Sequence, residues 1–151
     1  MKVTKKQIDA FFENKKIAAV GVSRNVKKFG YAVFRELRFK GYDIVPVNPN
    51  ADEIDGVKCY KSISELPGEI DSVLLMTPKK STDTVLKEVL DKGIKNIWVQ
   101  QSSDTKETIN LAASYQKEII TGKCIFMFSD PVVSIHKFHR NLVKMFGGLP
   151  K

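Results

Sequence analysis

The stretch Lys16-Ile17-Ala18-Ala19-Val20-Gly21-Val22-Ser23, residues 16–23, decides the fold. A short, nearly all-apolar run with a glycine near its end is typical of a strand buried on both faces of a parallel sheet. A helical pattern follows from about Lys28 to Lys40, with its apolar residues on one face and Gly41 placed to end it. Residues 16–41 therefore predict a strand, a glycine turn and a helix in succession.

The same alternation continues along the chain. Further strands are expected near residues 42–47, 71–77, 96–100 and 119–121, with a short one near 57–60, and a stretch at 124–128 that fits a strand or a buried helix. Ser81 is expected to cap the helix after the third main strand, and Asp104 with Glu107 to open the next. Such alternation implies right-handed crossovers and a parallel sheet. We expect a Rossmann-like, doubly wound α/β fold: a parallel sheet of about five to six strands in three α/β/α layers.

Length and composition fit one soluble domain spanning residues 1–151. No apolar run approaches the ~18 residues that a membrane span needs. Near the N-terminus, Thr4 and Gln7 can form the capping box of a short amphipathic helix, which is not the pattern of a signal peptide. Cys59 and Cys124 match no metal or redox spacing, so a reduced, cytoplasmic protein is expected.

The net charge of +8 is unevenly distributed, because residues 1–50 alone carry a balance of +7. Basic charge gathered around a glycine turn suits a phosphate-bearing small molecule, although lysines also simply solvate a surface. Nucleic-acid binding is disfavoured, because no segment interleaves aromatic and cationic residues as a stacking platform does.

The loop after the first strand carries the strongest functional signal. Gly21 permits a sharp turn and a close ligand, Ser23 offers a hydroxyl, and Gly30 permits close packing of helix on strand. The free N–H groups of the following helix point to the same space, and the cations Arg24, Lys27 and Lys28 can neutralise phosphates. The competing interpretation is an ordinary turn whose glycines serve geometry alone. We expect phosphate binding here.

This loop departs from the usual dinucleotide motif. Ser23 stands where the second glycine of G-x-G-x-x-G would be, and Asn48-Pro49 ends the second strand where an acid would bind a ribose diol. NAD is therefore disfavoured. NADP stays open, because Arg24 can reach a 2′-phosphate.

Two more loops are expected at the same edge of the sheet. One of them is Thr77-Pro78-Lys79, in which the proline shapes a wall for an adenine or pantetheine arm and the lysine adds a charge. The alternative is a proline that ends the strand, followed by a solvated lysine. Gln100 and the polar residues after it place amide groups at the cleft, with capping of the next helix as the alternative. Trp98 is expected in the core.

These residues resemble a known family. Residues 16–24, then Lys28-Phe29-Gly30 and Val45-Pro46-Val47-Asn48-Pro49, are similar to the stand-alone CoA-binding domain proteins, whose fold is similar to the N-terminal domain of the succinyl-CoA synthetase alpha subunit. The resemblance covers about residues 14–122. It implies that residues 21–30, including Val22 and Phe29, hold the CoA phosphates. It also implies that Val47-Asn48-Pro49 and Thr77-Pro78 line the adenosine and pantetheine path.

The resemblance implies binding of CoA or an acyl-CoA, and the residues supply no nucleophile paired with a base. We therefore expect binding without catalysis; an NADP-dependent oxidoreductase or another nucleotide-binding protein is the alternative. The tail forms an expected amphipathic helix at about 132–146, whose apolar stripe packs on the sheet or in a homodimer. Its His136 and His139 lack further ligands, so a basic helix face is expected and not a metal site.

Overall fold

A computed structural model describes residues 2–130, and the expected helix at 132–146, with His136 and His139, lies outside this range. The four α-helices are α1 (Lys5–Glu13), α2 (Phe29–Phe39), α3 (Lys79–Asp91) and α4 (Lys106–Ser114). The strands are β1 (Lys16–Val20), β2 (Asp43–Val47), β3 (Glu53–Ile54), β4 (Val57–Lys58), β5 (Ser72–Leu75), β6 (Asn96–Gln100) and β7 (Ile120–Lys123). Two 3-10 turns, η1 (Ile63–Glu65) and η2 (Ile125–Met127), complete the described elements.

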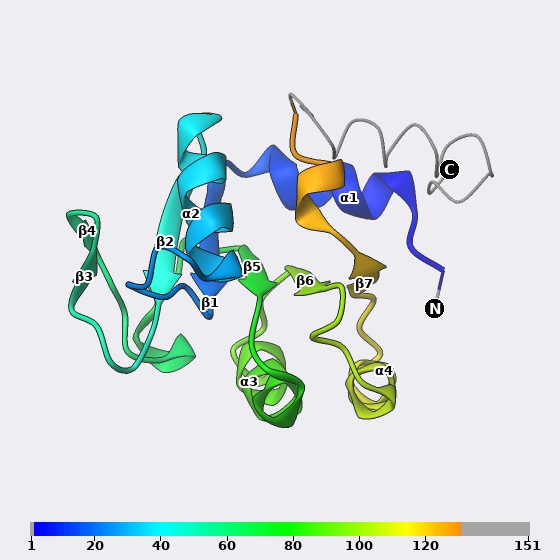
Figure 1. The fold of residues 1–151 in the computed structure, drawn as a ribbon. Coiled ribbons are helices and arrows are strands. Elements are labelled where there is room, and N and C mark those ends of the chain that lie inside the picture. The colour runs from blue at the N-terminus through cyan, green and yellow to red at the C-terminus, as the bar shows by residue number, and fades with distance from the viewer. Residues whose placement is uncertain (1, 131–151) are drawn as a thin grey trace.

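Five strands form one parallel sheet in the order β2-β1-β5-β6-β7 (Figure 1). The chain leaves β1 toward one side to make β2, then crosses back to place β5 on the other side of β1. The strand order therefore reverses between β1 and β5. This arrangement confirms the doubly wound parallel fold.

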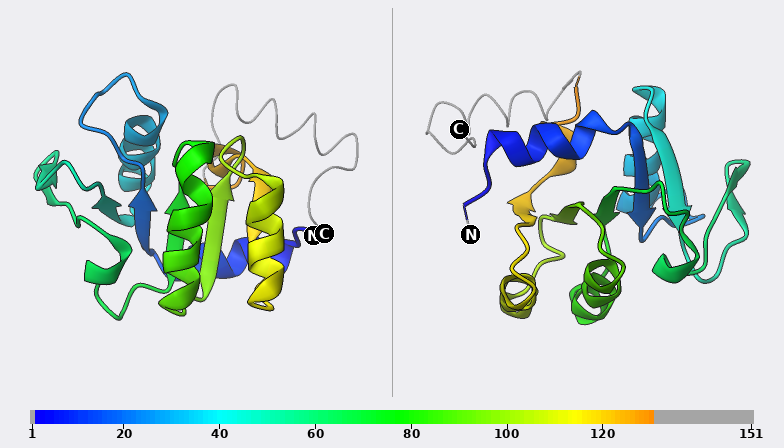
Figure 2. Two further views of the ribbon diagram at one scale, coloured as in Figure 1. Left: turned by 90° about the horizontal axis from the view of Figure 1, so that it is seen from below. Right: turned by 180° about the vertical axis from the view of Figure 1, so that it is seen from behind.

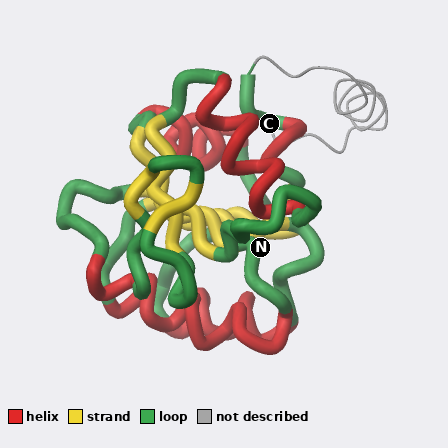
Figure 3. Tube along the Cα trace, turned by 60° about the vertical axis from the view of Figure 1, so that its left-hand side comes forward, coloured by secondary structure: helices red, strands yellow, loops and turns green. Residues whose placement is uncertain are grey.

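The helices cover both faces of the sheet. Because neighbouring residues of a strand point to opposite faces, Ile17 and Ala19 of β1 pack in one apolar cluster with α1 and α2. Ala18 and Val20 pack in a second cluster with α3 and α4. Figure 3 shows the sheet between the two helical layers, and Figure 2 shows α3 and α4 side by side on one face. Trp98 is fully buried in the first cluster, as predicted.

The N-terminal caps of the helices agree only in part with the sequence predictions. The capping box of Thr4 and Gln7 on α1 is confirmed. The predicted cap Ser81 is wrong, because α3 begins at Lys79, and the Ser81 hydroxyl donates to the carbonyl of Pro78 at 3.0 Å. Pro78 occupies the cap position with φ −58°, an angle that the proline ring imposes.

The predicted opening of α4 is also wrong. Thr105 caps this helix and forms a capping box with Thr108, so the pair Asp104 and Glu107 does not. Both threonine hydroxyls also donate to the carboxylate of Asp83 on α3, at 2.9 Å for Thr105 and 2.6 Å for Thr108. The tertiary contact with α3 favours the threonine cap.

The segment after β2 forms a hairpin at the edge of the sheet. β3 and β4 pair antiparallel around Asp55 and Gly56, whose φ values are 50° and 74°. Positive φ at both central positions is the geometry of a tight hairpin turn. Figure 1 shows this hairpin beyond β2.

Across residues 2–130 no helix combines the length and the apolar character that a bilayer crossing requires. In the same range, no group of three or more histidine, cysteine or acidic side chains is arranged to hold a metal ion. Cys59 and Cys124 are free thiols.

Candidate functional site

The carboxyl ends of the central strands lie at one level of the sheet. Val20 of β1 is in register with Val47 of β2 on one side and with Leu75 of β5 on the other. The loops that follow these three residues therefore start beside one another, at the reversal of strand order. Ligands of doubly wound sheets bind outside the strand ends at this point.

Two glycines allow these loops to close tightly. Gly21 has φ +92°, and a Cβ built on it would lie 2.7 Å from the carbonyl oxygen of Met76, the residue after β5. A Cβ on Gly30, in the first turn of α2, would collide with the carbonyl oxygen of Gly21. The start of α2 thus lies directly against the turn, which brings the helix N-terminus close to the strand ends.

The loop from Gly21 to Lys28 is held by its own polar groups. The Ser23 hydroxyl oxygen accepts from the N–H of Asn25 at 3.0 Å, and the Asn25 side-chain oxygen accepts from the N–H of Lys27 at 3.0 Å. Ser23 thereby fixes the turn while its hydroxyl hydrogen stays available to a ligand oxygen. The protein's own polar groups therefore hold the shape of this loop.

α2 and α3, which follow the two strands at the reversal of strand order, differ from α1 and α4. The N-cap residues of α2 and α3 are Lys28 and Pro78, which form no side-chain capping hydrogen bond, and neither helix has an acidic residue in its first turn. In contrast, α1 and α4 both carry capping boxes. Lysines stand at both uncapped ends: Lys28 at α2, and Lys79 in the first turn of α3. Because a helix N-terminus favours negative charge, the N-termini of α2 and α3 can each bind an anion.

Cations surround the same space. Arg24, Lys27, Lys28 and Lys79 are all exposed, and none of them forms a salt bridge within residues 2–130. The pKa of Asp52 is lowered mainly by its hydrogen bond to Lys61, and the charge of Arg24 lowers it further. The positive charge of Arg24 is therefore felt in the segment that follows β2.

Asn48 ties the loops after β1 and β2 together. Its side-chain N–H donates to the carbonyl of Val22 at 2.7 Å, and its side-chain oxygen accepts from the N–H of Asn50 at 2.8 Å. A second link is the N–H of Gly21, which donates to the carbonyl of Val47 at 3.3 Å. The polar groups of Asn48 are thus engaged in holding the loops, and they position the glycine turn against β2.

A pocket of about 320 Å³ opens on the other side of the turn, beyond β5. Phe29 and Met76 supply its apolar side, and residues 100–103 supply its polar side. Phe29 is 45% exposed, and its ring packs edge-on against that of Phe126, with 5.6 Å between ring centroids. Ser102 holds φ +73°, a conformation that costs a residue with a side chain about 1 kcal/mol or more. An apolar wall facing amide and hydroxyl groups suits a flexible chain with amide groups.

Comparison with known proteins identifies the family. A sequence model described as a CoA binding domain matches residues 15–130 of this chain. The chain belongs to the CoA-binding domain family. This confirms the resemblance drawn from the glycine loop and the Val-Asn-Pro segment.

The relatives of this CoA-binding domain include both large ligases and small proteins. The alpha subunit of acetate–CoA ligase (ADP-forming) II from Pyrococcus furiosus is 35% identical over 129 residues, which cover 78% of this chain and 28% of that subunit. The chain thus spans little more than a quarter of that relative. The uncharacterized protein YneT of Bacillus subtilis is 31% identical over 74% of this chain and 83% of its own length.

Solved structures of similar size share the fold. A conserved hypothetical protein of Pyrococcus furiosus is 39% identical, with a TM-score of 0.71, and the match covers 73% of this chain and 95% of that one. A hypothetical protein of Pyrococcus horikoshii is 31% identical, with a TM-score of 0.74, over 82% and 87% of the two chains.

The structure of this CoA-binding domain brings the predicted site residues to one edge of the sheet and divides them into two groups. Those exposed at the cleft are Arg24, Lys27, Lys28, Phe29, Pro49, Pro78 and Lys79, with Ser23 half-buried among them. Those that are buried or half-buried and support the loops are Gly21, Val22, Gly30, Val47, Asn48, Thr77 and Gln100, the last of which also lines the pocket.

Two of the supporting side chains are engaged inside the protein. The Gln100 side-chain oxygen accepts from the N–H of Ile125 at 3.1 Å, and the Thr77 hydroxyl pairs with that of Thr82 at 2.8 Å. The amide of Gln100 therefore fixes η2 beside the pocket, and Thr77 fixes the start of α3.

Sequence reasoning missed three residues that shape the site. Asn25 holds the glycine loop through its side chain, and a polar turn residue two positions before Lys27 is a recognisable signal for such a bond. Met76 and Phe126 line or support the pocket, and their places depend on strand register and on η2, for which no local pattern exists.

Removing the Asn48 side chain is expected to loosen the site. We expect Asn48→Ala to lower the free energy of unfolding by about 1–2 kcal/mol, because it leaves the Val22 carbonyl and the Asn50 N–H without their partner. Asn48→Asp keeps an acceptor for the N–H of Asn50 but cannot donate to the carbonyl of Val22. Comparing the two variants therefore separates the contributions of the two hydrogen bonds to stability. Urea denaturation measures both variants, with the exposed Asn50→Ala as control. If Asn48→Ala is as stable as the wild type, the Asn48 side chain does not hold the two loops together.

Proposed function

We propose that this chain binds CoA or an acyl-CoA across the carboxyl ends of β1, β2, β5 and β6. The observation that carries the proposal is the pair of uncapped helix starts, α2 and α3, each with a lysine, that follow the neighbouring strands β1 and β5 at the reversal of strand order. The protein's own side chains cap α1 and α4 instead. A ligand with several phosphate groups supplies the missing negative charge.

The arrangement of groups along the edge supports CoA in particular. Ser23 and the start of α2 would hold the pyrophosphate, and Arg24, whose charge is felt in the segment after β2, would meet the 3′-phosphate of the adenosine half. The pocket of about 320 Å³ beside Phe29 and Met76 would take the pantetheine arm. The 35% identity to an acetate–CoA ligase subunit adds support, since that enzyme is named for CoA.

We propose binding without a chemical step. Within residues 2–130, the Ser23 hydroxyl is bonded to the N–H of Asn25 and has no hydrogen bond to a carboxylate or an imidazole. A serine nucleophile requires such a base. The role that remains is that of a carrier or sensor of the bound CoA species.

Calorimetric titration with a set of nucleotides tests the proposal. We expect CoA and acetyl-CoA to bind with similar affinity, and dephospho-CoA to bind about 10-fold to 100-fold more weakly, since a charge-assisted contact with a cation is worth about 1.5–3 kcal/mol. ATP and NADPH serve as competitors. Absence of binding by every CoA species would sink the proposal, and tighter binding of NADPH than of CoA would favour the NADP alternative.

A further inference from the structure

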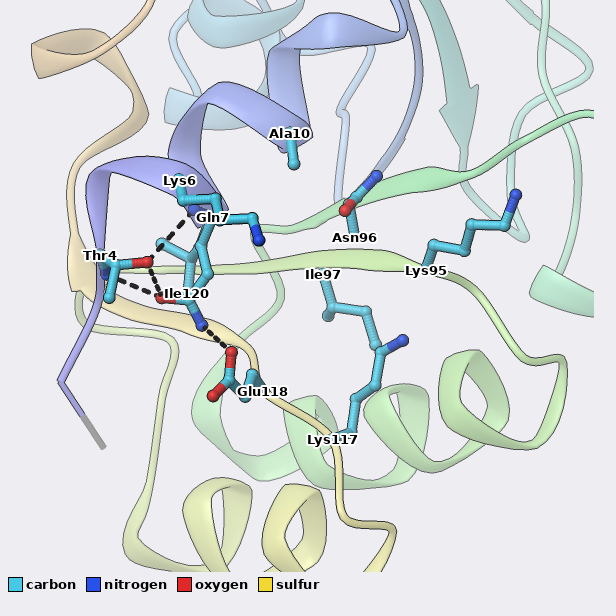
Figure 4. Close-up of a pocket in the computed structure, with 10 residues that line it drawn as sticks. All are labelled: Thr4, Lys6, Gln7, Ala10, Lys95, Asn96, Ile97, Lys117, Glu118 and Ile120. Carbon is cyan, nitrogen blue, oxygen red and sulfur yellow. Dashed lines mark hydrogen bonds between the residues drawn. The ribbon is translucent and has the colours of Figure 1, made fainter.

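A second pocket lies at the opposite edge of the sheet, at the amino ends of β6 and β7 (Figure 4). Asn96 and Ile120, the first residues of these strands, line it together with α1. Its volume is about 320 Å³, at the lower end of the range for small-molecule sites. The length of β6 separates it from the CoA cleft, so a ligand here would not touch the glycine loop.

The floor of this pocket is apolar and one side is closed by a polar contact. Ala10, Ile97 and Ile120 form the floor, and the last two are almost completely buried. The Gln7 side-chain N–H donates to the Glu118 carboxylate at 3.1 Å, which joins α1 to the segment before β7 (Figure 4). A ligand seated here has a hydrocarbon surface beneath it.

The rim is positively charged. Lys6 of α1, Lys95 before β6 and Lys117 before β7 come from three separate segments, and Glu118 is the one acidic side chain among the lining residues. Lys95 is paired with Asp71 at 3.1 Å, whereas Lys6 and Lys117 have no salt bridge within residues 2–130. Figure 4 shows the Lys117 side chain reaching toward Ile97.

From this combination we infer a binding site for a small organic acid. The carboxylate meets the amines of Lys6 and Lys117, and the hydrocarbon part covers Ala10, Ile97 and Ile120. Inorganic phosphate alone satisfies the amines but leaves the apolar floor uncovered, and a neutral molecule of the same shape lacks the ionic contact. The inference does not depend on CoA binding, because the two sites share no residue.

NMR titration of the full chain tests the inference with butyrate, its neutral isostere butanamide, and inorganic phosphate. Butyrate at millimolar concentration is expected to shift the amide signals of Gln7, Asn96 and Ile120 to saturation, with a Kd on the order of 1 mM for so small a ligand. Butanamide and phosphate are expected to bind at least about tenfold more weakly.

Two lysine variants complete the test. Lys117→Ala and Lys6→Ala are each expected to weaken butyrate binding about fivefold to tenfold, because each removes one charge-assisted contact. Lys106→Ala removes an exposed lysine on α4, outside the pocket, and is expected to leave the affinity unchanged. Equal binding of butyrate and butanamide, no saturable shift at the pocket, or wild-type affinity in both variants would overturn the inference. A parallel CoA titration reports on the other site separately.

Discussion

Replacing Ser23 by aspartate is expected to abolish CoA binding while the protein stays folded. An aspartate side chain can accept the N–H of Asn25 as the serine does, so the turn keeps its hydrogen bond. It places a full negative charge where we propose the pyrophosphate lies. At about 4–5 Å and an effective dielectric constant of about 20, this repulsion is about 3–4 kcal/mol, which weakens binding at least about 100-fold.

The neutral variant Ser23→Asn is the matched control. It has nearly the shape of aspartate and also accepts the Asn25 N–H, so it is expected to retain CoA binding within about tenfold. Ser64→Asp, on η1 and away from the cleft, controls for the change in net charge. Calorimetry with CoA gives the affinities, and circular dichroism checks the fold. If Ser23→Asp binds CoA with wild-type affinity, the glycine loop does not hold the phosphates.

Replacing Gly30 by alanine is expected to destabilise the protein by about 2–3 kcal/mol, as an overpacked contact does. The new Cβ would collide with the carbonyl oxygen of Gly21, and both sides of the contact are backbone, so the loop or α2 must shift. Helix propensity alone predicts the opposite sign, since alanine is more favourable than glycine in a helix by about 1 kcal/mol. The same shift moves the start of α2 away from the turn, so CoA affinity is expected to fall as well.

Urea denaturation of Gly30→Ala measures the stability. Gly68→Ala is the matched control, because a Cβ there meets nothing within 4 Å and its effect is expected to stay within about 0.5 kcal/mol. An unchanged or increased stability of Gly30→Ala would show that the helix and the glycine turn are not in close contact.

The sheet and its helices were predictable because their signals are local. The apolar runs at residues 16–22 and 71–77 contain the strands Lys16–Val20 and Ser72–Leu75, and Gly41, with φ +89°, follows α2 as predicted. The turn Asp55-Gly56 also carried a recognisable hairpin signal, which the expectation of a single short strand near 57–60 overlooked.

The details of the site were less predictable, because they depend on contacts between distant segments. Asn48 was predicted on the ligand path through family resemblance, whereas its side chain bonds across 26 residues to Val22. Gln100 similarly bonds to Ile125. The predicted caps of α3 and α4 are wrong for the same kind of reason. Pro78 takes the cap position of α3 instead of Ser81, and the contact with Asp83 favours a threonine cap on α4 over the local pattern at Asp104.

The most direct test of the central claim is an NMR map of CoA binding on the full-length chain. We predict that CoA shifts the amide signals of Ser23, Phe29 and Gly30 most strongly, because their N–H groups lie in or beside the proposed phosphate site, and that signals near Thr4 and Lys117 stay unchanged. No shift in the glycine loop at saturating CoA, or shifts confined to another part of the protein, would contradict the account.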